Sequence, residues 1–437
     1  MKKRSFRAKM FSEICLVMFL AVTFFIGSTT LLKAADVKPI KIGVVTFLSG
    51  AAASPFGVPA RNGAEVLTEA LNSGKVPAPY ATKGFGGAPI ELVFIDEAGG
   101  VTKQVTEYRN LVQRQNVDMV IGYISSGDAI AIPQVAEELK KLTIIFDAGT
   151  PRIFEEGSFK YTFRTGPTST MDSVAAAYYV SEGKKIEKIA GINQNYAWGI
   201  DSWNDFSAAM KALNPDVKVA VSQMPKLFAG QYGAEISSLL SCGAEVIHSS
   251  FYNGDLEAFV LQAVPRGLFK KSKVIFTAGE TAMYRLANNI PDGTMLGGRG
   301  PHGVFAPDNE LNRWFRNVYS DRYSIFPTYP SYKMVIAILG VKTAYEKAQA
   351  ANGGNAPNQD QIITAFEGLT YESPSGKVEM SLGKGHQAVQ EMVYGTVKHV
   401  GGKLTMTNIK RYPANKVNPP DGVKSADWIK SGFKKAK

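Results

Sequence analysis

The stretch that decides the fold is residues 40–57, IKIGVVTFLSGAAASPFG. Ile40 to Phe47 is a short, continuous apolar run rich in β-branched residues, and a loop of small residues follows it as far as Gly57. After the loop, small and apolar residues recur at helical spacing, at Ala60, Gly63, Ala64, Leu67 and Leu71. A continuous apolar strand is typical of a parallel sheet that helices cover on both faces. The stretch therefore predicts the opening strand, loop and helix of an α/β domain.

The same alternation of strand and helix continues to residue 146 and restarts after Arg164. We expect strands at 90–95, 117–121 and 142–146 in the first series, and at 186–192, 217–221, 246–248 and 274–277 in the second. Helical periodicity separates these strands. Two successive βα series in one chain predict an α/β protein with two Rossmann-like lobes and parallel central sheets.

The N-terminal segment is typical of a secretory signal peptide. Five basic residues lie between Lys2 and Lys9, an almost wholly apolar run follows from Ile14 to Gly27, and small residues come just after it. We expect residues 1–34 to be removed by cleavage after Ala34 or Ala35. The alternative is an uncleaved membrane anchor, although the apolar run is short for a span. The expected location is periplasmic.

Charge and cysteine content exclude several classes of function. The chain has 49 Lys and Arg against 38 Asp and Glu, a formal net charge of +11. Outside the signal segment these bases are dispersed, with several lysines near the C-terminus, whereas a nucleic-acid-binding protein concentrates them along one face. Cys242 is the only cysteine after the signal, and the four histidines lack metal-ligand spacing. We expect no nucleic acid partner, no metal and no cofactor.

Catalytic motifs are missing from the expected loops. The glycines at 84–87 precede a strand, which is the wrong context for a dinucleotide-binding turn. Ser125 and Ser126 lie near glycines without forming the Gly-x-Ser-x-Gly motif of a nucleophile elbow. Together with the export signal, this favours a binding protein that is not an enzyme. A ligand sensor and an exported hydrolase are the rival classes.

Unusual residues follow the predicted strands at their carboxyl ends, where open α/β sheets bind ligands. In the first series these loops are 49–57, 125–127 and 147–150; in the second they are 195–199, 251–252 and 278–280. The loops of Ser126 and Thr150 together predict an anion site, because hydroxyls and free N–H groups at a helix start favour a carboxylate. The serines could equally cap the helix that follows.

In order and spacing, several fragments of the chain resemble the type I periplasmic binding proteins of ABC importers, in particular the branched-chain amino-acid-binding branch. The fragments are Ile42-Gly43-Val44, Asn62-Gly63-Ala64, Gly122-Tyr123-Ile124-Ser125-Ser126, Ala148-Gly149-Thr150, Tyr196-Ala197-Trp198-Gly199 and Ser373-Pro374-Ser375-Gly376. The resemblance implies three hinge crossovers, near Phe163, Gly300 and Ser375. Lobe 1 would then be 38–162 with 301–375, lobe 2 would be 163–300 with 376–412, and 413–437 would be a tail that wraps the surface.

The resemblance also implies a set of ligand contacts. Ser126, Ala148 and Thr150, with their neighbours Ser125 and Gly149, would hold a ligand carboxylate. From the other lobe, Tyr196 and either Phe251 or Tyr252 would press on the ligand, with Phe56 at the pocket mouth. Glu280, or Gly279 in the same position, would meet a ligand ammonium, although Asp128 or Asp147 could take that role. The predicted site residues are thus Phe56, Ser125, Ser126, Ala148, Gly149, Thr150, Tyr196, Tyr252 and Glu280.

The function that the resemblance implies is that of an extracytoplasmic solute-binding subunit, which closes on a small carboxylated molecule. A branched-chain or other hydrophobic amino acid is the first expectation. An aromatic acid, an amide or a urea-like ligand is the alternative, because Asp147 places a negative charge beside the expected carboxylate site. The expected partners are this ligand and the membrane permease subunits of the importer, and the protein is expected to be a monomer.

Overall fold

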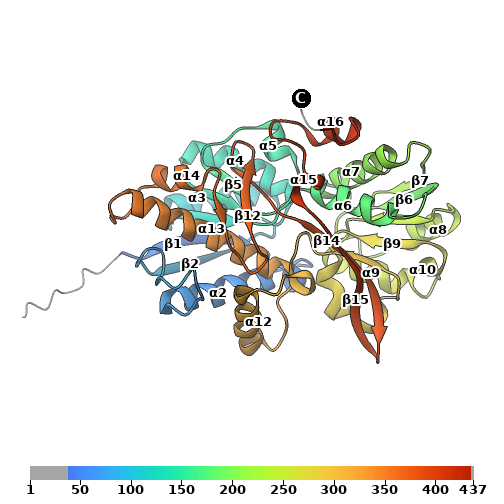
Figure 1. Ribbon diagram of the computed structural model, residues 1–437, viewed down its shortest axis with the longest axis horizontal. Coiled ribbons are helices and arrows are strands. Elements are labelled where there is room, and N and C mark those ends of the chain that lie inside the picture. Colours follow the sequence, from blue (N-terminus) through green and yellow to red (C-terminus); the bar gives the residue numbers. More distant parts are fainter. Residues whose placement is uncertain (1–37, 435–437) are drawn as a thin grey trace, which may run out of the picture. The chain divides into compact units, whose positions relative to one another are not determined.

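Two mostly parallel sheets organise the chain (Figure 1). The computed structural model describes residues 38–434, so the predicted signal peptide at 1–34 lies outside the described residues. Of these described residues, those from Pro39 onward belong to one compact unit. Among the described helices, none has both the length and the apolar character to cross a membrane.

The first sheet has eight strands in the order β11-β12-β13-β5-β4-β3-β1-β2. Strands β1 to β5 are all parallel to their neighbours, as the continuous apolar runs predicted, and Ile42 of β1 lies opposite Leu92 of β2. The bounds are β1 Ile40–Thr46, β2 Ile90–Asp96, β3 Met119–Gly122, β4 Thr143–Ile145, β5 Thr162–Arg164, β11 Thr370–Tyr371, β12 Val378–Leu382 and β13 Gln387–Val389.

The second sheet has seven strands in the order β15-β14-β10-β9-β8-β6-β7. Its β6 to β10 part is parallel, and the long hairpin of β14 and β15 adds an antiparallel edge. The bounds are β6 Lys188–Ile192, β7 Lys218–Gln223, β8 Val246–Ser249, β9 Lys273–Phe276, β10 Met295–Gly297, β14 Met392–Val400 and β15 Lys403–Tyr412.

Helices cover both faces of the first sheet, so its strands are buried on both sides. On one face, α13 packs against α2 and α14, and on the other α3 packs against α4. The helix α13 is buried along most of its length, including the side chains of Lys333 and Lys342. The helices here are α2 Val58–Ser73, α3 Val101–Gln113, α4 Ser126–Leu139, α5 Arg152–Glu156, α12 Glu310–Tyr323, α13 Tyr329–Ala351 and α14 Gln359–Phe366.

The second sheet is covered in the same way. The helices α6 and α7 pack together on one face, and α8, α9 and α10 lie on the other. These helices are α6 Ser169–Ser181, α7 Ala197–Leu213, α8 Gly233–Ser241, α9 Asn253–Ala263, α10 Leu268–Lys271 and α11 Met283–Leu286. The C-terminal helices α15 (Ala414–Val417) and α16 (Ser425–Lys430) pack on α6 and α7.

The C-terminal segment is part of the core, which differs from the expected surface tail. Val417, Trp428 and Ile429 are buried in the same apolar cluster as the helices α6 and α7. Pro, Lys and Asn dominate the composition of this segment, and they mask the few apolar side chains that dock. The segment therefore contributes apolar burial to the second half of the molecule.

The chain passes between the sheets three times: between β5 and β6, between β10 and α12, and at residues 390–391. The third passage differs from the expected boundary at Ser375, because β12 and β13 pair within the first sheet, with β13 beside β5. Both strands are short and lie close to the β14–β15 hairpin in sequence. Local pattern alone gives no sign of which sheet edge they join.

We expect Trp428→Ala to lower the free energy of unfolding by about 3–5 kcal/mol, the usual cost of truncating a buried aromatic side chain. Trp428 is 3% exposed and lies edge-on to Phe433, with ring centroids 5.2 Å apart. Urea denaturation measures the change. The exposed Lys430, on the same helix, supplies the control variant Lys430→Ala, which should change stability by no more than about 0.5 kcal/mol. Equal effects of the two variants would contradict docking of this segment.

Candidate functional site

A narrow cavity of about 10 Å³ lies among loops that leave the carboxyl ends of strands in both sheets. Its lining residues share this kind of position or begin a neighbouring helix: they are Phe56, Ile124, Ser126, Asp147, Gly149, Tyr196, Trp198, Tyr252, Arg299 and Tyr329. Five of the nine predicted site residues are in this lining, namely Phe56, Ser126, Gly149, Tyr196 and Tyr252. The parallel strands of an open sheet bring such loops together at one edge, and ligands of α/β proteins commonly bind at that edge.

The two adjacent serines take different roles. Ser125 is the N-cap of α4, and its hydroxyl accepts a hydrogen bond from Asp128 N at 3.4 Å. Ser126 is fully buried and lines the cavity, where its Oγ accepts hydrogen bonds from Gly149 N at 3.3 Å and Thr150 N at 3.2 Å. The capping role thus belongs to Ser125, while Ser126 connects the loops that follow β3 and β4.

The remaining predicted residues lie beside the cavity without lining it. Thr150 donates its hydroxyl hydrogen to Asp201 Oδ2 of α7 at 2.7 Å, and Ala148 N donates to Tyr123 O at 3.1 Å. Glu280 is fully buried and accepts a hydrogen bond from Tyr329 N, the first residue of α13, at 2.9 Å. In this structure the carboxyl group of Glu280 bonds the first backbone N–H of α13. An ion pair between Glu280 and a ligand ammonium therefore stays a prediction.

Aromatic side chains make up half of the residues that line the cavity. Phe56 lies edge-on to both Tyr252 and Tyr329, with ring centroids 5.0 and 5.2 Å away. The hydroxyl of Tyr196 donates to that of Tyr252 at 2.8 Å, and Trp198 Nε1 donates to Ser250 O at 2.9 Å. The polar ends of Tyr196, Tyr252 and Trp198 thus have partners within the wall, so their rings can offer apolar surface to a ligand.

Arg299 is the cation of the site, and it is 4% exposed. Its Nη1 donates to Asp147 Oδ1 at 2.8 Å and its Nε to Asp172 Oδ2 at 3.0 Å, while its guanidinium lies 4.4 Å from the centre of the Trp198 ring. Burial works against the charge of Arg299, but the carboxylates of Asp172 and Asp147 outweigh it and raise the pKa above its ordinary value. The guanidinium therefore stays charged in the cavity wall.

Lys333, on α13, completes a buried group of four charges with Arg299, Asp147 and Asp172. Its Nζ donates to Asp147 Oδ1 at 2.6 Å. Burial and the nearby Arg299 lower the pKa of Lys333 to about 7. Burial likewise raises the pKa of Asp172, against the opposing effect of Arg299 and Lys333. Because the group contains two carboxylates and two cationic side chains, its net charge is close to zero.

Gly149 is required where the loop after β4 meets this group. A Cβ at this position would lie 2.5 Å from Arg299 Nη2 and 2.5 Å from Trp198 Cζ3. Any side chain would therefore push the guanidinium and the indole ring away from the loop.

Sequence reasoning did not select Ile124, Trp198, Arg299 or Tyr329 as ligand contacts, and named Asp147 only as a possible acid. A signal existed for Arg299, which stands among Gly297, Gly298 and Gly300 directly after the strand β10. Tyr329 carries no such signal, because it reaches the cavity from the start of α13, far from any strand end. Within residues 38–434, no cluster of three or more His, Cys, Asp or Glu side chains could hold a metal ion.

Comparison with known proteins gives one family match and distant relatives. The model of a family described as periplasmic binding protein matches residues 39–403. The chain is 28% identical to Leu/Ile/Val-binding protein homolog 3 of Brucella melitensis over 224 residues, 51% of this chain and 57% of that protein. It is 25% identical to homolog 4 of the same organism over 374 residues, 82% of this chain and 84% of that protein.

A solved structure shares the fold. This is the solute-binding protein of an ABC transporter from R. palustris, crystallised in complex with benzoate. The two structures align with a TM-score of 0.73 and 19% sequence identity, and the alignment covers 88% of this chain and 99% of the other.

Titration of Glu280 should make the folded protein less stable as the pH rises from about 4.5 to about 7. Burial raises the pKa of Glu280 to about 7 from an ordinary 4.5, against the opposing N–H of Tyr329. The folded state therefore keeps a proton that the unfolded state loses above pH 4.5, so this contribution is complete below pH 4.5 and is lost as the pH rises to 7. We expect Glu280→Gln to remove this pH dependence, which amounts to a loss on the order of 3 kcal/mol in the free energy of unfolding.

Urea denaturation of wild type and Glu280→Gln at pH 5 and pH 8 measures this contribution. Glu379→Gln, at an exposed position of β12, is the matched control and should keep the wild-type difference between the two pH values. The same pH dependence in wild type and Glu280→Gln would show that the acid does not titrate in this range.

Proposed function

This chain belongs to the periplasmic binding protein family, and from that membership we propose that it is the extracytoplasmic solute-binding subunit of an ABC importer. The observation that carries the proposal is the cavity whose lining comes from loops of both sheets. A ligand in such a cavity contacts both halves at once, so its binding energy favours their closed arrangement. The importer's permease subunits would recognise that arrangement.

The same proposal covers location, oligomeric state and chemistry. Residues 1–34 would direct export to the periplasm and be removed there. The subunit would act as a monomer and carry out no catalytic step, since its task is to bind and release one small solute.

The ligand class that the cavity supports best is a small carboxylate with a flat, apolar body. Phe56, Tyr196, Trp198, Tyr252 and Tyr329 offer ring surface on several sides. Arg299 supplies a buried positive charge beside them; its Nη2 donates to Pro167 O at 3.0 Å, and its guanidinium also bonds the side chain of Tyr329. A carboxylate could pair with this guanidinium while its ring stacks among the aromatic side chains, once the two halves part to admit it. The structurally similar R. palustris protein holds benzoate.

An apolar α-amino acid is the second candidate, and Asp147 is the observation that favours it. Asp147 is the only carboxylate in the cavity lining, and its Oδ2 has no hydrogen-bond partner among the described residues. A ligand ammonium could pair with that oxygen. Asp147 already pairs through Oδ1 with Arg299 and Lys333, which weakens its pull on a further cation. The names of the curated relatives, Leu/Ile/Val-binding protein homologs, also fit this candidate.

Calorimetric titration with benzoate, benzamide and phenylalanine tests the proposal and separates the two ligand classes. We expect benzoate to bind at least tenfold more tightly than benzamide, because a hydrogen bond between charged groups contributes about 1.5–3 kcal/mol. Benzoate should also bind more tightly than phenylalanine, which brings an ammonium into the site. Preference for phenylalanine would select the amino acid, and failure of all small carboxylates and amino acids to bind would contradict the proposal.

The aromatic lining of the cavity is tested by a pair of matched variants. Phe56→Ala should weaken benzoate binding at least tenfold, since the ring contacts both Tyr252 and Tyr329 in the cavity wall. Phe85→Ala truncates another fully buried phenylalanine of the same apolar cluster, outside the cavity lining. Both variants should lose about 3–5 kcal/mol of stability. Equal loss of benzoate affinity in the two would show a general effect of destabilisation.

A further inference from the structure

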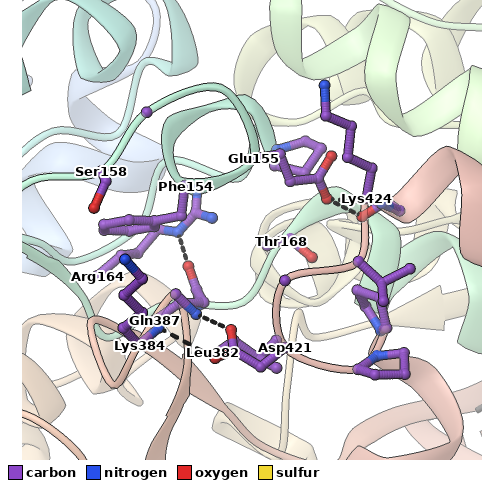
Figure 2. A pocket seen from close by; sticks show the side chains of 18 of the residues that line it. Phe154, Glu155, Ser158, Arg164, Thr168, Leu382, Lys384, Gln387, Asp421 and Lys424 are labelled. Carbon is purple, nitrogen blue, oxygen red and sulfur yellow. Dashed lines mark hydrogen bonds between the residues drawn. The ribbon is translucent and has the colours of Figure 1, made fainter. Parts of the chain in front are cut away.

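A second pocket, of about 280 Å³, lies away from the cleft between three segments that are far apart in sequence (Figure 2). The segments are the stretch from α5 to the start of α6, the turn between β12 and β13, and residues 419–425 of the C-terminal segment. None of the cavity-lining residues of the cleft belongs to this pocket.

Arg164, the last residue of β5, lines this pocket and is 1% exposed. Its Nε donates to Gln387 Oε1, and its Nη1 donates to Ala148 O at 3.1 Å and to Thr150 O. Its Nη2 has no hydrogen bond within residues 38–434, and in that part of the chain no carboxylate lies within ion-pair distance of the guanidinium. A buried arginine with no carboxylate in ion-pair contact is costly: burial and the charge of Arg299 lower the pKa of Arg164 to about 9, against the weaker opposing effect of Glu155.

The two acids that line the pocket have other partners. Glu155 Oε1 accepts hydrogen bonds from Ser425 N at 2.9 Å and from the Ser425 hydroxyl, and Figure 2 shows its side chain extended toward the segment at 424–425. Asp421 accepts hydrogen bonds from Gly383 N at 2.6 Å and Lys384 N at 3.4 Å. With Lys384 and Lys424 also in the lining, the pocket carries one more cation than anion.

The rest of the lining is largely apolar. Phe154 covers the guanidinium of Arg164 (Figure 2), whose central carbon is 5.7 Å from the ring centroid. Phe159 lies edge-on to Phe154, with ring centroids 6.3 Å apart. Pro151, Leu382, Pro419 and Pro420 complete the apolar walls. An occupant that matches these walls has an apolar body and one negative group for Arg164.

We propose that this pocket is a second ligand site that binds a small apolar monocarboxylate, with the carboxylate on Arg164 Nη2. The site is independent of the cleft ligand, but the same guanidinium holds the carbonyls of Ala148 and Thr150, on either side of Gly149 in the cleft wall. An occupant of the second pocket would therefore fix the loop that carries Gly149.

Binding of 4-fluorobenzoate, followed by ¹⁹F NMR with the full mature chain, tests this site. We expect a bound signal that persists in Phe56→Ala, which impairs the cleft, and that weakens at least tenfold when Phe56→Ala is combined with Ser158→Trp, which fills the second pocket from an exposed lining position. Glu156→Trp places the same side chain at an exposed neighbouring position outside the lining and should leave that signal unchanged. The neutral 4-fluorobenzamide should give no such signal.

Three results would each overturn the proposal. These are binding that survives in Ser158→Trp and disappears in Phe56→Ala, equal binding of the amide and the acid, and absence of any bound signal in Phe56→Ala at millimolar acid. If Ser158→Trp fails to fold by circular dichroism, Leu382→Trp blocks the pocket from the β12 side and answers the same question.

Discussion

The arrangement of the cleft depends on the buried ion pairs of Arg299. Charges removed from water are tolerated only when they are paired and hydrogen-bonded, and Arg299 meets two carboxylates from different parts of the chain. Asp147 comes from the loop after β4 of the first sheet, and Asp172 from α6, which covers the second. Loss of either partner would leave an uncompensated charge in the interior, so these ion pairs favour the arrangement of the two halves in which both carboxylates reach Arg299.

Two helices that begin at the cleft lack a stabilising N-cap side chain. The helices α7 and α9 begin with Tyr196 and Tyr252 at the N-cap, and neither side chain caps its helix. Serine, threonine, aspartate and asparagine are the usual N-cap residues, and each stabilises a helix by about 1 kcal/mol. Here that position carries an aromatic ring that lines the cavity instead. Local rules of this kind are commonly broken where a protein binds its ligand.

Sequence pattern was sufficient for the fold because most strands are short apolar runs that helices cover on both faces. The runs at 90–95 and 246–248 lie within β2 and β8 of the structure. Pattern failed for β12 and β13, whose sheet is decided by pairing with β5, more than two hundred residues earlier. The same limit applied to the site. Loops after predicted strands gave Phe56, Ser126, Gly149, Tyr196 and Tyr252, whereas Tyr329 enters from a helix start that only tertiary packing brings to the cavity.

The pairing of β13 with β5 has a consequence for how the polypeptide acquires its structure. Gln387 lies opposite Arg164, and their side chains bond across 223 positions of sequence. The first sheet therefore cannot be completed until the strands β6 to β10 of the second sheet have been synthesised, and contacts so distant in sequence slow folding. Folding one half after the other in order of synthesis, the common route for successive domains, is closed to this topology. When the chain has been made as far as residue 389, the edge of β5 that faces away from β4 must still be unpaired, so that β13 can join it.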